Sequence, residues 1–125
     1  MLKTNESAEN YLETILVLSQ KKPVVRGVDI AEELGFKKSS VSVAMKNLRE
    51  KEQIRVTPEG YIYLTDSGRA IAEMIYERHQ RLSRGLMSLG VDEQTATEDA
   101  CRIEHVISQE SFEAIKRHLH MTAEK

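Results

Sequence analysis

The chain has 125 residues, 40% of them hydrophobic and 30% charged, and a formal net charge of −2. These values fit one globular domain, or two small lobes that share a core. No apolar run reaches the roughly 18–20 residues of a membrane-spanning helix, and the N-terminus lacks the apolar core of a signal peptide. The single cysteine excludes an intramolecular disulfide framework, so we expect a cytoplasmic protein. Because the net charge is slightly negative, any basic surface for nucleic acid must be local.

The first predicted element is a helix over residues 6–20, where apolar side chains recur at helical spacing and Ser7 is a suitable N-cap. Asn10 and Glu13 are three residues apart and therefore share a face of this helix. By themselves these two side chains are most simply interpreted as exposed polar residues. Residues 21–27 contain a proline and a glycine and are predicted to be a connector.

Two short helices joined by a tight turn follow this connector. Residues 28–34 have helical apolar spacing, and Gly35 is predicted to end the helix. The next helix is predicted to begin with Ser39 or Ser40 as its cap and to reach about Lys51. This pair of helices is typical of a helix-turn-helix motif.

The second helix of this motif carries the local positive charge that the whole chain lacks. Lysine and arginine residues are frequent between residues 37 and 51, where Glu50 is the single acid. The short hydroxyl side chains of Ser39, Ser40 and Ser42 would let DNA phosphates approach the N-terminal N–H groups of the helix. The alternative is an amphipathic helix that simply faces solvent.

A β-hairpin is predicted after the helix-turn-helix motif. Residues 53–56 and 61–64 are β-prone, and residues 57–60 form a turn sequence between them. A helix-turn-helix followed by a hairpin is a winged helix. We therefore expect a mainly α protein with a small β-hairpin wing, in which residues 1–68 bind DNA and residues 69–125 form a helical lobe.

The helical lobe is predicted to contain a long helix from the 65–68 segment to about Leu89, with Leu82, Leu86 and Leu89 on its apolar stripe. His79 lies on the same stripe, where a histidine is more often part of the core than a ligand. A second helix is predicted from residue 91 to about His105. A third, capped by Ser108 and extending to about residue 119, has Phe112, Ile115 and Leu119 on its inward face.

The second of these helices carries three residues that can bind a metal. Cys101, Glu104 and His105 are separated by offsets of three and four, which place them on one helical face. A thiolate, a carboxylate and an imidazole could fill half of the coordination shell of a first-row metal. The alternative is a core cysteine beside a surface Glu–His pair, so ligands from other segments are needed to favour the metal site.

The order of these motifs resembles that of the diphtheria-toxin-repressor and manganese-transport-regulator family, whose members are metal-activated bacterial transcriptional repressors. The segments that carry the resemblance are residues 11–15, 64–68 and 100–108. The resemblance implies a divalent metal bound by Asn10, Glu13, His79, Cys101, Glu104 and His105. It also implies a homodimer that binds a near-palindromic double-stranded DNA operator and represses genes of iron or manganese homeostasis.

The sequence departs from the family pattern at several positions. Asn10 replaces the methionine or aspartate of relatives, Cys101 is the choice of iron-type members, and Glu13 is the choice of manganese-type members. Ser83 and Thr97 stand where iron-type members place the ligands of an ancillary site, which we expect to be absent. We also expect a short form without the SH3-like domain, because the chain stops after the last predicted helix. The donor set favours Fe(II), then Mn(II), while Co(II), Ni(II) or Zn(II) can substitute.

The resemblance also implies which residues contact DNA. Base contacts are expected at the start of the recognition helix, and Val43 can contribute only apolar contact with a thymine methyl group. The expected base contacts are Lys37, Ser39, Ser40 and Val43; the expected phosphate contacts are Lys38, Lys46 and Arg49, together with the Ser42 hydroxyl. For the dimer interface the candidates are Val106, Ile107, Phe112 and Ile115.

Two other classes of function are compatible with the residues. The chain could be a metal-independent winged-helix regulator in which Cys101 senses oxidation. It could also be a metal-dependent enzyme, because two histidines and a carboxylate can form an open iron site. The sequence argues against an enzyme, since it has no Gly-rich phosphate loop and too short a chain to enclose a substrate.

Overall fold

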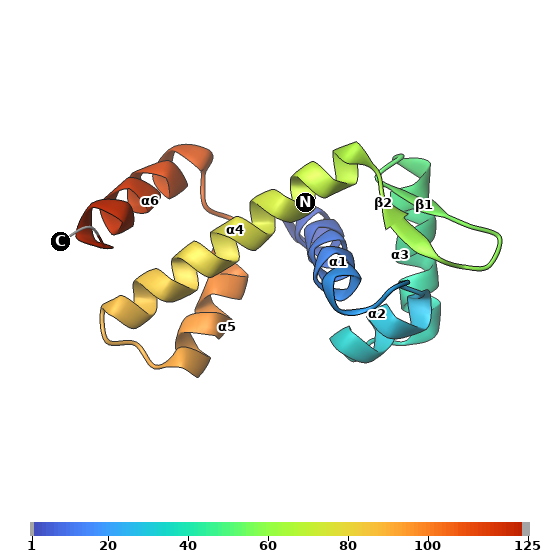
Figure 1. Ribbon diagram of the computed structural model, residues 1–125, viewed down its shortest axis with the longest axis horizontal. Helices are drawn as coiled ribbons and strands as arrows, with labels where there is room; N and C mark the ends of the chain where they lie inside the picture. The colour runs from blue at the N-terminus through green and yellow to red at the C-terminus, as the bar shows by residue number, and fades with distance from the viewer. Residues whose placement is uncertain (1, 124–125) are drawn as a thin grey trace. The chain divides into compact units, whose positions relative to one another are not determined.

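The computed structural model describes the backbone of residues 2–123 and the side chains of residues 7–119. In this part of the chain it contains helices and one antiparallel hairpin (Figure 1), which confirms the mainly α fold with a β-hairpin wing. The elements are α1 (Leu2–Lys21), α2 (Gly27–Leu34), α3 (Lys38–Glu50), β1 (Ile54–Val56), β2 (Ile62–Leu64), α4 (Asp66–Ser88), α5 (Glu93–Ile103) and α6 (Gln109–Ala123). The chain divides into two compact units, residues 3–74 and residues from 75 onward, so that α4 contributes to both.

The helix-turn-helix of the first unit is defined by local signals at both ends of α2. At its start, the Asp29 carboxylate accepts a hydrogen bond of 2.9 Å from the Arg26 N–H group, which satisfies a donor near the helix N-terminus. At its end, Gly35 has a φ of 69°, a left-handed conformation that glycine adopts without steric cost. The predicted turn between α2 and α3 is therefore confirmed.

Two predicted helix caps are wrong. Helix α3 begins at Lys38, with Lys37 in the extended conformation of an N-cap but without a side-chain hydrogen bond. Ser39 and Ser40 are already within the first turn of α3, whereas a cap residue needs a non-helical backbone. Ser7 lies inside α1, which begins at Leu2, because the preceding residues include neither glycine nor proline and the helix continues through them.

The hairpin after α3 forms as predicted, with Arg55 paired to Tyr63 in the antiparallel register. Its turn contains Gly60 at a φ of 88°, and the Gly60 N–H group donates to the Thr57 carbonyl oxygen at 2.9 Å. On its other edge, the Ile62 N–H group donates to the carbonyl oxygen of Val25 at 2.8 Å. The connector before α2 therefore holds the wing in place.

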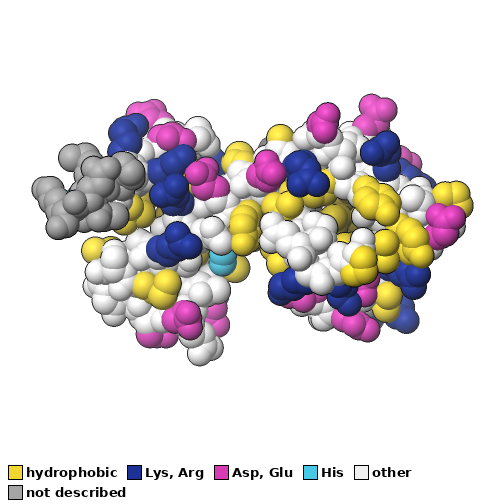
Figure 2. Space-filling view, viewed as in Figure 1, with side chains coloured by type: hydrophobic (Ala, Val, Ile, Leu, Met, Phe, Trp, Pro, Cys, Tyr) yellow, Lys and Arg dark blue, Asp and Glu magenta, His cyan; other side chains and the backbone are white. Residues whose placement is uncertain are grey.

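The first unit has its own hydrophobic core, to which each of its elements contributes. Its most deeply buried side chains include Leu12, Ile15, Ile30, Val41, Leu48, Ile54, Ile62 and Ala72. Polar and charged side chains remain on its surface, and Figure 2 shows acidic and basic side chains interspersed over the face in view. The core thus fixes α3 and leaves the outer face of that helix accessible to solvent.

The second unit is built from the rest of α4 together with α5 and α6. Its core contains Leu82 from α4, Ala100 from α5 and Phe112 from α6, and Ile103 and Ile107 pack against them. Side-chain caps define the starts of the two shorter helices. The Asp92 carboxylate accepts from the Thr95 N–H group at 3.2 Å, and the Ser108 hydroxyl accepts from the Ser111 N–H group at 3.0 Å, which confirms the Ser108 cap.

Two residues predicted to face inward are exposed. Leu89 is 81% exposed because α4 ends at Ser88 and Leu89 lies in the turn that follows. Ile115 is 37% exposed, although Phe112, one turn earlier in α6, is buried. None of the helices in the described part of the chain is both long and apolar enough to cross a membrane.

The junction between the hairpin and α4 requires Gly68. The Gln53 carbonyl oxygen accepts a hydrogen bond of 3.1 Å from the Thr65 N–H group. The Thr65 hydroxyl in turn donates to the Glu52 carbonyl oxygen and accepts from the Gly68 N–H group. A Cβ atom at position 68 would overlap the Gln53 carbonyl oxygen, so this contact of two backbones excludes a side chain.

We expect the substitution Gly68→Ala to lower the free energy of unfolding by about 1–3 kcal/mol, because backbone atoms must shift to admit the methyl group. Urea unfolding followed by circular dichroism measures this change. Gly27→Ala is the matched control, because its Cβ would lie 4.0 Å from Val41 Cγ1, an ordinary contact. Equal stability of the two variants would contradict the assigned role of Gly68.

Candidate metal centre

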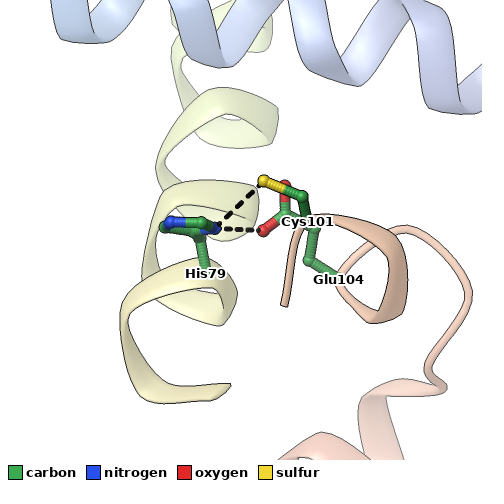
Figure 3. Close-up of side chains that lie close together, drawn as sticks. All are labelled: His79, Cys101 and Glu104. Atoms are coloured by element: carbon green, nitrogen blue, oxygen red, sulfur yellow. Dashed lines mark hydrogen bonds and ion pairs between the residues drawn. The ribbon is translucent and has the colours of Figure 1, made fainter. Parts of the chain in front are cut away.

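Three of the expected metal ligands come together in the second unit (Figure 3). His79 projects from α4, Cys101 from the last turn of α5, and Glu104 from the residue that caps α5. One ligand atom from each residue lies within 4.8 Å of those from the other two. Cys101 and Glu104 are three residues apart, and this spacing turns both side chains toward the same part of α4.

The distances between these atoms are suited to a bound metal. His79 Nδ1 lies 3.0 Å from Glu104 Oε2 and 3.7 Å from Cys101 Sγ. Ligand bonds of about 2.0–2.3 Å leave neighbouring ligand atoms about 3–4 Å apart in a tetrahedral or octahedral shell. The three side chains therefore need little rearrangement to bind one ion.

Burial of Glu104 is the strongest sign that this cluster has a function. Its side chain is 0% exposed, and a buried carboxylate is costly unless its oxygens are compensated. Oε2 faces His79, whereas Oε1 has no hydrogen-bond partner among the described residues and lies 3.4 Å from His105 Nε2. An incompletely compensated carboxylate next to an imidazole and a thiol fits a divalent first-row metal.

The electrostatics of the cluster favour a cation at the same point. The hydrogen bond to Cys101, and then the hydrogen bond to Glu104, raise the pKa of His79 to about 10, although burial opposes this change. In the metal-free protein the imidazole is therefore protonated at neutral pH. The proton supplies the positive charge that the buried carboxylate requires, and a metal bound at this point would replace it.

His105 is close to this cluster but is not one of the three residues whose ligand atoms converge. The prediction that α5 continues to about His105 is wrong, because the helix ends at Ile103. The N–H groups of Val106 and Ile107 both donate to the Ile103 carbonyl oxygen, so the chain turns toward α6 after Glu104. The His105 side chain is buried and lies beside Glu104, and its assignment as a ligand stays a prediction.

The remaining expected ligands, Asn10 and Glu13, lie in α1 and belong to the first unit. Both side chains are half-buried. The backbone carbonyl oxygen of Asn10 accepts a hydrogen bond of 2.8 Å from the Thr14 hydroxyl. Their role as ligands stays a prediction. In the second unit, the Ser83 hydroxyl donates to the Gln80 carbonyl oxygen at 3.2 Å, and the expected absence of an ancillary site there also stays a prediction.

The residues expected to contact DNA are all exposed in the structure. They are Lys37, Lys38, Ser39, Ser40, Ser42, Val43, Lys46 and Arg49. A shallow hollow beside Val56 of β1 is lined by four of them, which are Ser42, Val43, Lys46 and Arg49. The first turn of α3 has no side-chain cap, so its N–H groups are available to phosphate oxygens.

Sequence reasoning missed Arg78, which is buried next to the candidate metal centre. Its guanidinium donates to the carbonyl oxygens of Glu104 and Ile107, each at 3.0 Å. The signal was present in the sequence, since Arg78 is three residues after Ile75 and four before Leu82, on the apolar stripe of α4. A charged residue in such a stripe indicates a buried partner.

Comparison with known proteins agrees with this arrangement over both units. The model of the N-terminal DNA-binding domain of iron-dependent repressors matches residues 3–61. The model of their metal-binding and dimerisation domain matches residues 65–124. Together the two matches include the helix-turn-helix, the first strand of the hairpin and the cluster of His79, Cys101 and Glu104.

Individual relatives give the same result. An uncharacterised HTH-type transcriptional regulator of Methanocaldococcus jannaschii is 33% identical over 114 residues, which are 90% of this chain and 91% of that protein. The HTH-type transcriptional regulator MntR of Bacillus subtilis is 34% identical over 112 residues, 90% of this chain and 79% of MntR. A solved manganese-dependent transcriptional repressor in complex with manganese is similar with a TM-score of 0.82 and 27% identity. That comparison covers 90% of this chain and 52% of the solved chain, so this chain spans about half of its length. The chain therefore belongs to the iron-dependent repressor family of metal-responsive transcriptional regulators, which includes the manganese regulators.

Proposed function

We propose that this protein is a metal-activated transcriptional repressor that controls genes of iron or manganese homeostasis. The observation that carries the proposal is the convergence of His79 Nδ1, Cys101 Sγ and the buried Glu104 carboxylate in a chain that also has a winged helix. The matches to a DNA-binding model and a metal-binding model support both halves of the proposal. Residues 1–68 would bind DNA, and residues 69–125 would bind the metal and form the dimer.

The ligand set that we propose has His79, Cys101 and Glu104 at its centre. The family resemblance adds His105 from the same unit, and Asn10 and Glu13 from α1. A thiolate beside imidazole and carboxylate favours Fe(II), with Mn(II) next, because Mn(II) prefers shells that are richer in oxygen. Later metals such as Co(II), Ni(II) and Zn(II) would also bind in vitro, since affinity rises along the first row.

Metal binding would act on DNA binding through a shift of population. The proposed ligands belong to both units, so the ligated state favours one arrangement of the DNA-binding units among several. If that arrangement fits the operator, thermodynamic linkage requires the operator to tighten metal binding by the same factor. In a homodimer the two recognition helices would read half-sites of a near-palindromic operator, spaced by about 34–36 Å.

The second unit offers an apolar surface for dimerisation. A hollow of about 840 Å³ is lined mainly by α4 and α6, including Leu86, Leu89, Ile115 and Leu119. Exposed leucine and isoleucine side chains beside a concave surface favour contact with a second copy related by a two-fold axis. Among the earlier candidates for this interface, Phe112 belongs to the core instead, and Ile107 is partly buried against it. Val106, at 59% exposed, and Ile115 remain available for such a contact.

A second candidate function is a winged-helix regulator that responds to oxidation through Cys101. The exposed thiol of Cys101, whose Sγ lies 3.7 Å from His79 Nδ1, favours it because an oxidant can reach this sulfur. The two candidates differ in their response to substitution. Cys101→Ser should abolish an oxidation response, whereas a Cys101→Ser protein that still represses and still responds to metal would argue against this alternative.

An enzyme is not supported, since the relatives are transcriptional regulators.

We expect the purified protein to bind a DNA duplex from its own upstream region only when metal is present. Binding should be absent with chelator and should appear anaerobically with Fe(II), Mn(II) or Zn(II), in an order that ranks the metals. His79→Ala and Glu104→Ala should lose the metal-dependent binding, because each removes a ligand. Fluorescence anisotropy of the labelled duplex measures these changes.

Glu98→Ala is the matched control for this experiment, since Glu98 is an exposed carboxylate of α5 outside the cluster. It should respond to metal as the wild type does. Equal DNA binding with and without metal would leave the winged helix intact and would refute the metal switch.

At pH values below the raised pKa of about 10, we expect the competition between metal and the His79 proton to make the metal affinity rise about tenfold for each unit of pH. The metal requires a neutral imidazole, so a proton competes with it at every pH below that value. Competition with a chelator of known pH dependence, from pH 6 to 8, measures the slope. His118→Ala, which removes an exposed histidine of α6, should keep this slope, and an affinity that does not change with pH would contradict the prediction.

We expect Lys46→Ala to weaken binding to all DNA sequences and to reduce the salt slope of the binding constant by about one. Lys46 is exposed on α3 and lines the hollow next to Val56, which fits a phosphate contact. Lys116→Ala is the control of equal charge change, because Lys116 pairs with Glu77 in the second unit. An unchanged salt slope in Lys46→Ala would exclude the phosphate assignment.

A further inference from the structure

We propose that Arg78 is a positioning residue for the metal centre, which holds Glu104 in the place where its carboxylate can bind a metal. This inference rests on the proposed function and adds to it a residue that is not a ligand. Arg78 is 7% exposed. Of the lysine, arginine, aspartate and glutamate residues in the described part of the chain, only Arg78 and Glu104 are buried. The two are directly connected.

The guanidinium of Arg78 binds the chain segment that follows α5. Nη1 donates to the carbonyl oxygens of Glu104 and Ile107, each at 3.0 Å. Nη2 donates to Gln109 Oε1 at 2.9 Å, and the guanidinium carbon lies 5.6 Å from the centre of the Phe112 ring. Carbonyl groups at the end of a helix lack intrahelical partners, so Arg78 satisfies the Glu104 carbonyl oxygen that α5 leaves open and also ties down the connection at Ile107.

Glu104 is therefore held at both ends by consecutive residues of α4. His79 contacts its carboxylate at 3.0 Å, and Arg78 contacts its backbone carbonyl at 3.0 Å. Adjacent helical residues point about 100° apart, which allows one helix to reach both ends of Glu104. With its backbone held, the carboxylate has few positions to adopt, and it remains close to His79 before metal arrives.

The planar guanidinium is suited to this role in a way that lysine is not. Several N–H groups in one plane can reach two carbonyl oxygens and an amide oxygen together, whereas an ammonium on a flexible stem cannot span them. Residues that orient metal ligands typically change metal affinity by about 10–100-fold when they are substituted. The effect of Arg78 should thus appear in metal binding by a protein that is still folded.

The test is an anaerobic Co(II) titration of the full chain, with the wild type, Arg78→Lys and Arg81→Lys compared. Arg81 is the matched control, since it lies on α4 but forms only a surface pair with Glu77. Circular dichroism before each titration identifies the folded proteins. We expect Arg78→Lys to bind Co(II) about tenfold more weakly and to alter the d–d absorption bands. The thiolate-to-cobalt charge-transfer band from Cys101 should remain.

A double-mutant comparison separates positioning from a general structural role. In a Glu104→Ala background, Arg78→Lys should have no further effect on Co(II) affinity, because the proposed action passes through Glu104. An equal loss in both backgrounds would overturn the proposal, and so would a folded Arg78→Lys protein with wild-type affinity and spectrum. Failure of the wild type to bind any metal would instead refute the proposed function.

If Arg78→Lys does not fold, Gln109→Ala tests the same set of contacts. It removes the acceptor of Nη2 from an exposed position and leaves the buried guanidinium in place. We expect a several-fold lower Co(II) affinity, and wild-type affinity in this variant would overturn the proposal.

Discussion

A carboxylate without access to water lies at the centre of the second unit, and the surrounding structure compensates its charge. The carboxylate of Glu104 is paired with His79, its backbone carbonyl is held by Arg78, and Cys101 lies one turn earlier in α5. Each of these partners would be unnecessary if Glu104 faced solvent. The burial of this one acid therefore connects the packing of α4, α5 and α6 with the binding of a cation.

If the proposed function holds, the same arrangement serves both folding and regulation at one site. In the absence of metal, a proton on His79 balances the carboxylate, since the pKa of His79 is raised to about 10. The metal-free unit can therefore fold with its ligands already close to one another. Under the proposed function, a metal would replace the proton in a site that exists beforehand, which would reduce the conformational cost of binding.

Features governed by local chemistry could be predicted from the sequence, while features that depend on distant partners could not. The turns at Gly35 and Gly60 and the cap at Ser108 follow from nearby residues, and the structure confirms all three. The end of α5 was predicted too late, because it depends on how the chain turns toward α6. Arg78 was missed for a similar reason, since its acceptors lie 26 or more residues away in sequence. The convergence of His79 with Cys101 and Glu104 could be inferred only with the family resemblance.

One face of helix α3 packs into the core, and the other face carries the expected DNA contacts. This separation has an evolutionary consequence. Val41, Met45 and Leu48 are buried and hold the helix in the fold, whereas the expected DNA contacts, including Val43 at 61% exposed, contribute little to the core. Surface substitutions of this kind usually change stability by less than about 0.5 kcal/mol. The outer face can thus diverge among relatives without loss of the folded state, so the operators they recognise can change faster than the architecture that presents them.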